Sequence, residues 1–243
     1  MHYLDFLAGL HERLRPRTYL EIGISQGHSL ALSRCPSIGI DPQFCVTEGL
    51  QTPTVLVKAT SDAYFARLER DRTGPFGKFP VDFAFIDGLH HFEQALRDFI
   101  GIERHAAATS VIAFDDVFPR DVEEAARFRD VMPWTGDVFR IPFALKRWRP
   151  DLTLIRVNTD PTGTLVVAHV DSTSPLLTDA LDDIVRDYVE PDPQAVPAAV
   201  LRRHQALRPE KVLALPIWDE LVAARQPIRG RAVPVVGPGG PNS

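Results

Sequence analysis

Apolar residues recur in two patterns along the first two thirds of the chain, one typical of helices and one typical of strands. Leucines at helical spacing predict an amphipathic helix over 3–15, which Pro16 ends. Short apolar runs predict strands at 19–24, 37–41, 54–59, 81–87, 110–114, 152–157 and 164–170. Between them the pattern predicts helices at 29–35, 62–70, 92–106 and 122–131, and an irregular segment at 133–139.

The alternation of strands and helices up to residue 157 predicts right-handed strand–helix–strand units. The run over 81–87 is almost continuously apolar, which is typical of a strand covered on both faces. Strands 152–157 and 164–170 flank a turn and predict a hairpin. We therefore expect an α/β fold with a doubly wound, mostly parallel, seven-stranded Rossmann-like sheet.

The character of the chain changes after Ser172. Helices are predicted at 174–188, 195–206 and 217–225, separated by proline-rich connections. The sequence thus divides into a sheet domain over 1–172, a C-terminal helical extension over 173–226 and a tail over 227–243, which we expect to be disordered. The extension is expected either to cover the ligand site or to form a homo-oligomer contact, and the pattern leaves both open.

Length and composition narrow the class of protein. With 243 residues and 44% hydrophobic composition, the chain can bury a sizeable core without metal or disulfide staples. A net charge of −5 argues against a general nucleic-acid or membrane-surface binder. The two cysteines, Cys35 and Cys45, are expected to be free thiols. The first residues do not resemble a signal peptide and no window is apolar enough for a membrane span, so a cytoplasmic location is expected.

The first predicted strand runs into a glycine turn, Glu-Ile-Gly-Ile-Ser-Gln-Gly over 21–27. Such a turn brings backbone N–H groups to one point, which suits a nucleotide or anionic cofactor. In an open α/β sheet the ligand lies beyond the carboxyl ends of the strands. The chain places there, strand by strand, Glu21 and Gly23, Asp41, Ser61 and Asp62, Asp87 and His90, and Asp115 and Asp116. Asp41, after the second strand, is placed to bind the hydroxyls of a ribose.

Four motifs now carry a resemblance: Tyr-Leu-Glu-Ile-Gly-Ile-Ser-Gln-Gly, Gly-Ile-Asp, Ile-Asp-Gly-Leu-His and Phe-Asp-Asp. In this order they resemble class I S-adenosylmethionine-dependent methyltransferases. The similarity is closer to the subgroup (family 24-like) that includes metal-dependent O-methyltransferases of sugars and natural products. It covers roughly residues 1–170 and does not extend to the C-terminal helices.

The resemblance implies roles for individual residues. It implies cofactor binding by Glu21, Gly23, Ser25, Gly27, Asp41, Ser61, Asp62 and Asp87. It implies Mg²⁺ binding by Asp87, Asp115 and Asp116, and catalysis by His90 or His91 together with Asp87. The chain departs from the commoner family pattern in having Ser25 where a middle glycine stands, and it lacks the usual glycines before the fifth strand.

The chemistry gives these residue types a reason to be there. Methyl transfer from a sulfonium is an in-line displacement, which needs orientation and a deprotonated nucleophile. A divalent cation on three carboxylates would lower the pKa of an acceptor hydroxyl, and a histidine would take its proton. The alternative is that these residues have a purely structural role, in which Asp115 and Asp116 cap a helix and Asp87 closes a turn. Trp134 and Trp148 are expected either to line an acceptor pocket or to pack in the core.

Three other functions are compatible with parts of the sequence. The same turn matches the Gly-x-Ser-x-Gly elbow of α/β-hydrolases, with Ser25 as nucleophile, but no strand precedes it. A nicotinamide-dependent oxidoreductase would use the same turn and acid, and would leave the Asp-Asp pair unexplained. A third alternative is a catalytically silent methyltransferase-like scaffold. The sequence favours a metal-assisted O-methyltransferase of a small hydroxylated metabolite, such as a sugar or a natural product.

Overall fold

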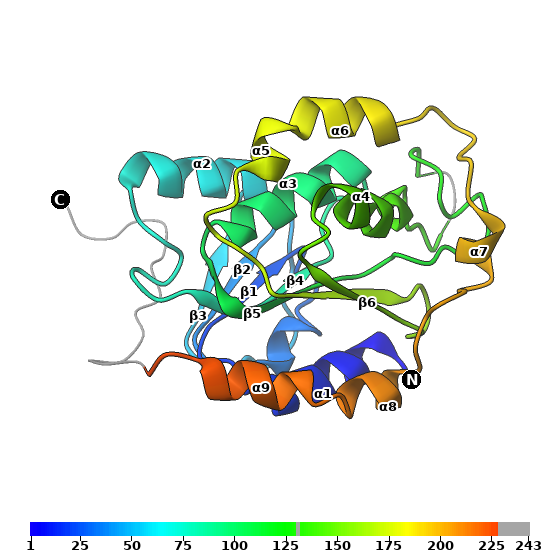
Figure 1. Ribbon diagram of the computed structural model, residues 1–243. Helices are drawn as coiled ribbons and strands as arrows, with labels where there is room; N and C mark the ends of the chain where they lie inside the picture. Colours follow the sequence, from blue (N-terminus) through cyan, green and yellow to red (C-terminus); the bar gives the residue numbers. More distant parts are fainter. Residues whose placement is uncertain (130–131, 228–243) are drawn as a thin grey trace.

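A seven-stranded sheet forms the centre of the protein, whose computed structural model describes residues 1–129 and 132–227 (Figure 1). The strand order is β3-β2-β1-β4-β5-β7-β6. The first five strands in this order are parallel, and β7 runs antiparallel to both β5 and β6. The strands are β1 (Tyr19–Ile22), β2 (Ser37–Ile40), β3 (Thr54–Val57), β4 (Val81–Ile86), β5 (Ala106–Phe114), β6 (Thr153–Val157) and β7 (Thr164–Ala168).

The predicted strands are confirmed, and their burial explains why the sequence identified them. Every residue of β1, β2 and β4 is buried, because helices or loops cover both faces of the central strands. The hairpin is confirmed as well, with Val157 opposite Thr164 at its closed end. Strand β5 begins at Ala106, four residues before the expected start at Ser110.

One layer of helices covers the upper face of the sheet in Figure 1. It contains α2 (Ser61–Asp71), α3 (Phe92–Glu103), α4 (Ile141–Trp148), α5 (Leu176–Asp179) and α6 (Leu181–Tyr188). Phe92 and Phe99 of α3 pack in one core with Phe114 of β5. The start of α2 is fixed by Thr60, whose side chain accepts a hydrogen bond from the N–H of Ala63.

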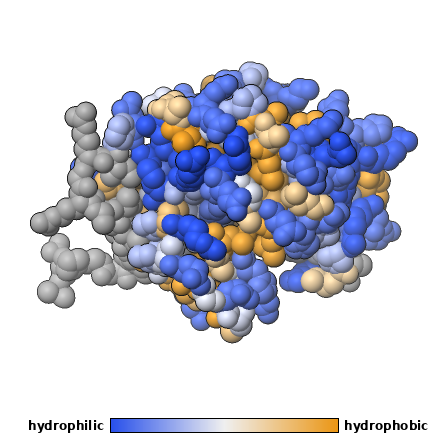
Figure 2. Space-filling model, turned by 90° about the horizontal axis from the view of Figure 1, so that it is seen from below, coloured by the Kyte–Doolittle hydropathy of each residue, from blue (hydrophilic) through white to orange (hydrophobic). Residues whose placement is uncertain are grey.

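The second layer is built from the two ends of the chain. Below the sheet in Figure 1, α1 (Tyr3–Leu14) packs against α8 (Pro209–Leu213) and α9 (Ile217–Ala224). Trp218 and Leu221 of α9 belong to the same core as Phe83 and Phe85 of β4. Figure 2 shows this face of the molecule, where hydrophobic residues appear in patches among more abundant hydrophilic ones. The apolar sides of α8 and α9 are therefore used within the chain.

The last helices occupy this face because the early connections lack helices of their own. Between β1 and β2 there is only a single 3₁₀ turn, Leu30–Leu32, where the sequence predicted a short helix over 29–35. That prediction is wrong: Ser33 leaves the helical region, and the next residues already approach β2. No helix lies between β2 and β3 in this fully described part of the chain.

The helix predicted over 122–131 is wrong for its described part, residues 122–129, which form turns; residues 130–131 lie outside the described residues. A helix would direct the Glu124 carbonyl to the N–H four residues on. Here that carbonyl accepts hydrogen bonds from the N–H groups of Thr135 and Gly136, at 2.9 and 3.0 Å. Partners distant along the sequence thus replace the helical ladder.

Short helices explain the remaining differences. The helix expected over 174–188 is divided into α5 and α6, and the one expected over 195–206 is reduced to α7 (Ala198–Leu201). Arg203 and Gln205 then adopt positive φ angles of 50° and 67°, which end the helical path. The sequence did not predict α4 or α8, which span only 8 and 5 residues.

The predicted tail falls on residues 228–243, outside the described part apart from residue 227. Across the described residues, every helix is too short or too polar to cross a membrane.

Candidate functional site

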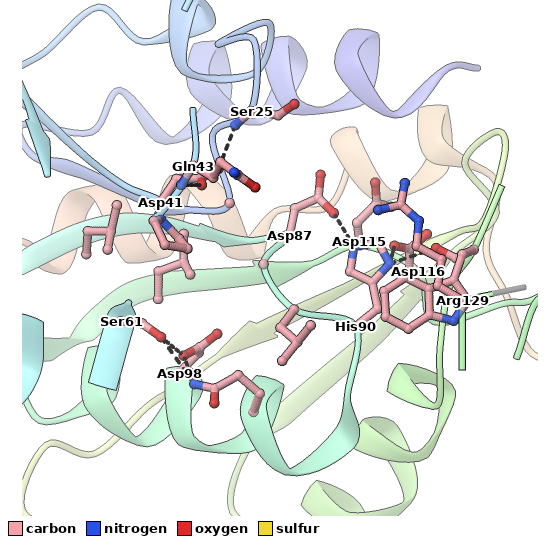
Figure 3. Close-up of a pocket in the computed structure, with 18 of the residues that line it drawn as sticks. Ser25, Asp41, Gln43, Ser61, Asp87, His90, Asp98, Asp115, Asp116 and Arg129 are labelled. Atoms are coloured by element: carbon pink, nitrogen blue, oxygen red, sulfur yellow. Dashed lines mark hydrogen bonds and ion pairs between the residues drawn. The ribbon is translucent and has the colours of Figure 1, made fainter. Parts of the chain in front are cut away.

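A cavity of about 730 Å³ opens at the carboxyl ends of the parallel strands. It collects most of the residues that the sequence placed at this edge, from five strand ends (Figure 3). The predicted residues that line it are Gly23, Ser25, Asp41, Ser61, Asp62, Asp87, His90, Asp115 and Asp116. The structure does not bring Glu21, Gly27 or His91 to its walls.

The glycine turn after β1 passes directly against the end of β4. Gly23 has φ +86°, and a Cβ there would lie 1.8 Å from the carbonyl oxygen of Asp87. Only glycine satisfies both conditions, because other residues would add strain and a clash. The N–H of Asp87 donates to the carbonyl of Ile22 at 2.8 Å, which fixes the turn beside the acidic residue.

Asp41 is held by the same turn. Its carboxylate accepts hydrogen bonds from the backbone N–H of Ser25, at 2.9 Å, and of Gln43, at 2.6 Å. Ser25 has φ +45°, so the middle of the turn takes a left-handed conformation although it is not glycine. Each carboxylate oxygen retains a lone pair for a hydroxyl of a ligand.

Glu21 lies beneath the turn rather than in the cavity. It is fully buried and accepts hydrogen bonds from the hydroxyls of Tyr19, at 2.7 Å, and Ser29, at 2.5 Å. Burial raises the pKa of Glu21 to about 8, against the opposing effect of these two hydrogen bonds. Gly27, with φ +86°, lies behind the turn beside Val46. Both residues support the turn and do not touch the cavity.

At the other end of the cavity, His90 sits between two carboxylates (Figure 3). Its Nε2 is 3.4 Å from Asp87 Oδ1, and its Nδ1 is 3.1 Å from Asp116 Oδ2. The Nδ1 atom also lies 2.7 Å from the carbonyl oxygen of Trp134, and the imidazole stacks on the indole ring at 5.1 Å. A doubly protonated imidazole fits this setting, since both nitrogens face acceptors.

The charges of this cluster perturb one another. Burial alone would lower the pKa of His90, but the hydrogen bond to Asp87 and the negative charges of Asp116 and Asp87 raise it to about 9. Burial, opposed by the positive charge of His90, raises the pKa of Asp116 to about 6. Burial and then the charges of Asp116 and Asp87 raise the pKa of Asp115 well above its usual range.

His91 is turned away from this cluster. Its Nε2 lies 3.0 Å from the carbonyl oxygen of Arg127, so the ring helps to position the segment after β5. Of the two tryptophans considered for an acceptor pocket, Trp134 lines the cavity. Trp148 instead packs against the hydrophobic core of the upper layer.

Sequence reasoning missed several lining residues, among them Tyr3 on α1, and Gln94 and Asp98 on α3. Asp98 is buried, and its position four residues after Gln94 places both on one stripe of the helix. The available signal was the place of Asp98 among the buried positions Ala95, Phe99 and Ile102 at helical spacing. Tyr3 had no signal, because only the packing of α1 under the sheet brings it to the strand ends.

The donor set of the cluster fits a hard divalent cation. Ligand atoms of Asp87, His90 and Asp116 all lie within 4.8 Å of one another. Asp115 Oδ1 is buried and makes no hydrogen bond with any described residue. An orphaned carboxylate oxygen beside two further carboxylates is suited to Mg²⁺, which prefers oxygen ligands. The resemblance named Asp87, Asp115 and Asp116, whereas the group that the geometry brings together contains His90 in place of Asp115.

Comparison with known proteins agrees with this architecture. Residues 20–117 match the sequence model of a family described as a methyltransferase domain. No curated protein matches the chain in a sequence search. Cofactor-bound Rv0187 from MTB is similar in structure, with TM-score 0.51 and 19% identity over 70% of this chain and 80% of that one.

Two other solved structures are similar at lower scores. The O-methyltransferase TomG from Streptomyces achromogenes, in complex with SAM, has TM-score 0.48 and 20% identity over 68% of this chain and 78% of that one. The O-methyltransferase from Bacillus cereus, in complex with SAH, has TM-score 0.47 and 15% identity over 68% and 80%. The strand order and the position of the cavity agree with these comparisons: the chain has the class I methyltransferase fold, and its residues 20–117 match the methyltransferase domain model.

Proposed function

We propose that this protein is an S-adenosylmethionine-dependent O-methyltransferase, assisted by a divalent cation, that acts on a small hydroxylated metabolite such as a sugar or a natural product. One observation carries the proposal. A single cavity joins the glycine turn and Asp41 at one end to the cluster of Asp87, His90 and Asp116 at the other. A methyl donor and an acceptor hydroxyl need such adjacent sites.

The cofactor half of the cavity is assigned to the turn. The glycine turn brings the backbone of Gly23 and Ser25 to the wall of the cavity, beside the methionine part of the cofactor. Asp41 accepts hydrogen bonds from the ribose hydroxyls, because its oxygens already point from the end of β2 toward the turn. Ser61 and Asp62, at the start of α2, lie beside the adenine.

The acceptor half is assigned to His90 and its neighbours. Trp134 and Pro161 provide apolar walls for the ring of a small molecule, and His90 provides a base near its hydroxyl. Between two ionised carboxylates His90 keeps its proton at neutral pH, so it can accept another group's proton only when that charge is neutralised. A divalent cation bound by Asp87, Asp115 and Asp116 would neutralise the charge and lower the pKa of a nearby hydroxyl.

Calorimetric titration with S-adenosylhomocysteine tests the cofactor half. We expect micromolar binding to the wild type and at least about tenfold weaker binding to Asp41→Ala, since each tenfold is ~1.4 kcal/mol. Asp183→Ala is the matched control, because Asp183 is exposed on α6 and its one ion pair within the described part of the chain is with Arg186. Absence of binding to the wild type would refute the proposal.

The metal is tested separately by titrating MgCl₂ into metal-free protein. A binding heat that EDTA abolishes and that Asp116→Asn removes would support the site. If S-adenosylhomocysteine binds but Mg²⁺ does not, the acceptor is activated by protein groups alone. A screen of hydroxylated sugars and phenols, with and without Mg²⁺, then identifies the acceptor class.

A further inference from the structure

The acceptor end of the cavity contains an arginine, Arg129, that the proposed function does not use. Among the described residues, it is the only arginine or lysine that lines the cavity. Figure 3 shows Arg129 at the same end as His90, Asp115 and Asp116, away from Asp41. Its charge therefore faces the acceptor and not the cofactor.

The guanidinium of Arg129 lacks the carboxylate partner that neighbouring arginines have. These arginines form ion pairs, Arg120 with Glu124, Arg127 with Asp137 and Arg140 with Glu190. Among residues 1–129 and 132–227, the hydrogen-bonding contacts of the Arg129 guanidinium are with the sulfur of Met132, 3.2 Å from Nε and 3.0 Å from Nη2. A thioether sulfur is a weak acceptor, so the hydrogen-bonding capacity of this guanidinium is largely unused.

The two nitrogens beside the sulfur are those that can hold an anion. Nε and Nη2 lie on one edge of the planar guanidinium and donate in parallel, which matches the two oxygens of a carboxylate or a phosphate. Met132 is 71% exposed and its unbranched side chain is flexible, so an anion can displace the sulfur at little cost.

Trp134 determines where this guanidinium lies relative to His90. The indole Nε1–H donates to the carbonyl of Ala126 at 2.5 Å, which anchors the ring. The imidazole of His90 stacks on the indole with 5.1 Å between ring centroids, and the guanidinium carbon of Arg129 lies 5.9 Å from the centre of the indole ring. A small molecule whose hydroxyl faces His90 can therefore reach Arg129 with a substituent.

We propose that the acceptor is acidic, and that Arg129 binds its carboxylate or phosphate group while its hydroxyl faces His90. This rests on the proposed function, which places the acceptor beside His90 and Trp134. Both anions offer strong oxygen acceptors in the spacing of the guanidinium edge, where the sulfur is a weak one. Arg129 thus selects the acidic member among molecules that carry the same hydroxyl groups.

The balance of charge at this end of the cavity allows an anion to bind. The carboxylates of Asp87, Asp115 and Asp116 alone would repel it. The divalent cation of the proposed function offsets their charge, and the charge of Arg129 then remains for the acceptor. An arginine that is merely solvated at the surface would need neither a place on the cavity wall nor the contact with Trp134.

Calorimetry on protein saturated with S-adenosylhomocysteine and Mg²⁺ tests the proposal with matched pairs of acidic and neutral molecules. The pairs are para-hydroxybenzoate with para-hydroxybenzamide, glucuronate with glucuronamide, and glucose 1-phosphate with glucose. In at least one pair the acid should bind about 10- to 100-fold more tightly, as hydrogen bonds to a charged group allow. The pair that shows this preference distinguishes a carboxylate from a phosphate.

Arg129→Gln should reduce this preference by at least about tenfold, because it removes the charge and the paired donors. Arg186→Gln, the same exchange at an exposed arginine of α6, should keep the wild-type preference. The proposal is overturned if no acid binds more tightly than its neutral partner, or if the preference persists in Arg129→Gln. A preference that persists there and is abolished by EDTA would assign the anion to the cation instead.

Titration with S-adenosylhomocysteine comes first and separates the two proposals. If the wild type does not bind it, the proposed function fails and this inference falls with it. If the wild type binds it and shows no preference for acids, only the role of Arg129 is refuted. Arg129→Gln should bind S-adenosylhomocysteine as the wild type does, which also shows that the variant is folded.

Discussion

The pH dependence of stability should carry the signature of Glu21, the buried acid beneath the glycine turn. Its carboxyl group is fully buried, and its hydrogen-bond partners among residues 1–129 and 132–227 are the hydroxyls of Tyr19 and Ser29. Burial raises its pKa from the ordinary 4.5 to about 8. Glu21→Gln keeps the shape and one acceptor, gains a donor for either hydroxyl, and removes the titration.

The magnitude follows from the two pKa values. Between about pH 5 and pH 8 the unfolded chain has released the Glu21 proton, while the folded protein still holds it. The folded state therefore binds more protons, and the unfolding free energy falls as the pH rises through this window. At ~1.4 kcal/mol for each pKa unit, the fall amounts to roughly 3 kcal/mol.

Urea unfolding, monitored by circular dichroism at about pH 5, 6, 7 and 8, measures this effect. The difference in unfolding free energy, Glu21→Gln minus wild type, should grow by roughly 3 kcal/mol across the series. All other titrating groups are common to both proteins and cancel in this difference. Parallel stability curves would show that Glu21 is ionised in the folded protein, and the reasoning from burial would be refuted.

Three further substitutions test the framework around the site. Gly23→Ala should lower the unfolding free energy by at least about 1 to 3 kcal/mol and abolish S-adenosylhomocysteine binding in calorimetry, because it adds strain and meets the carbonyl of Asp87. Arg149→Met should cost about 3 to 5 kcal/mol in urea unfolding, because it leaves Glu103 buried without its counter-charge at 2.8 Å. Trp218→Ala should cost about 3 to 5 kcal/mol in the same assay, since the indole is fully buried. A loss of unfolding free energy below about 1 kcal/mol in the Arg149 or the Trp218 variant would contradict the packing described.

The sequence predicted the sheet and the edge of the site well, for a physical reason. Strands covered on both faces must be apolar throughout, so β4 could be recognised, and its carboxyl end followed directly at Asp87. The directions of individual side chains were harder. Side chains alternate along a strand, so Glu21 lies on the same face of β1 as Tyr19. Tyr19 belongs to the core below the sheet, and the alternation alone would have placed Glu21 there too.

Contacts between residues distant in the sequence determined the features that the sequence did not predict. The segment over 122–129 has helical composition, yet its Glu124 carbonyl is used by Thr135 and Gly136. His90 was expected, with His91 as the alternative, to take the proton of the acceptor, and only the meeting of two strand ends showed it between Asp87 and Asp116. Asp98 has no motif of its own, and it is held by a hydrogen bond from the hydroxyl of Ser61, 37 positions away.

In the layer below the sheet, α8 and α9 pack beside α1, so this layer can fold only after the C-terminal helices have been synthesised. Arg13 pairs with Asp219 across 206 positions of sequence, and Arg225 donates to the Leu14 carbonyl across 211. Until α9 has left the ribosome, the aromatic face of β4 that contains Phe83 has no complete cover. Closure of this layer therefore carries the entropy cost of a very long loop, and the chain exposes an aggregation-prone aromatic surface until the layer has closed.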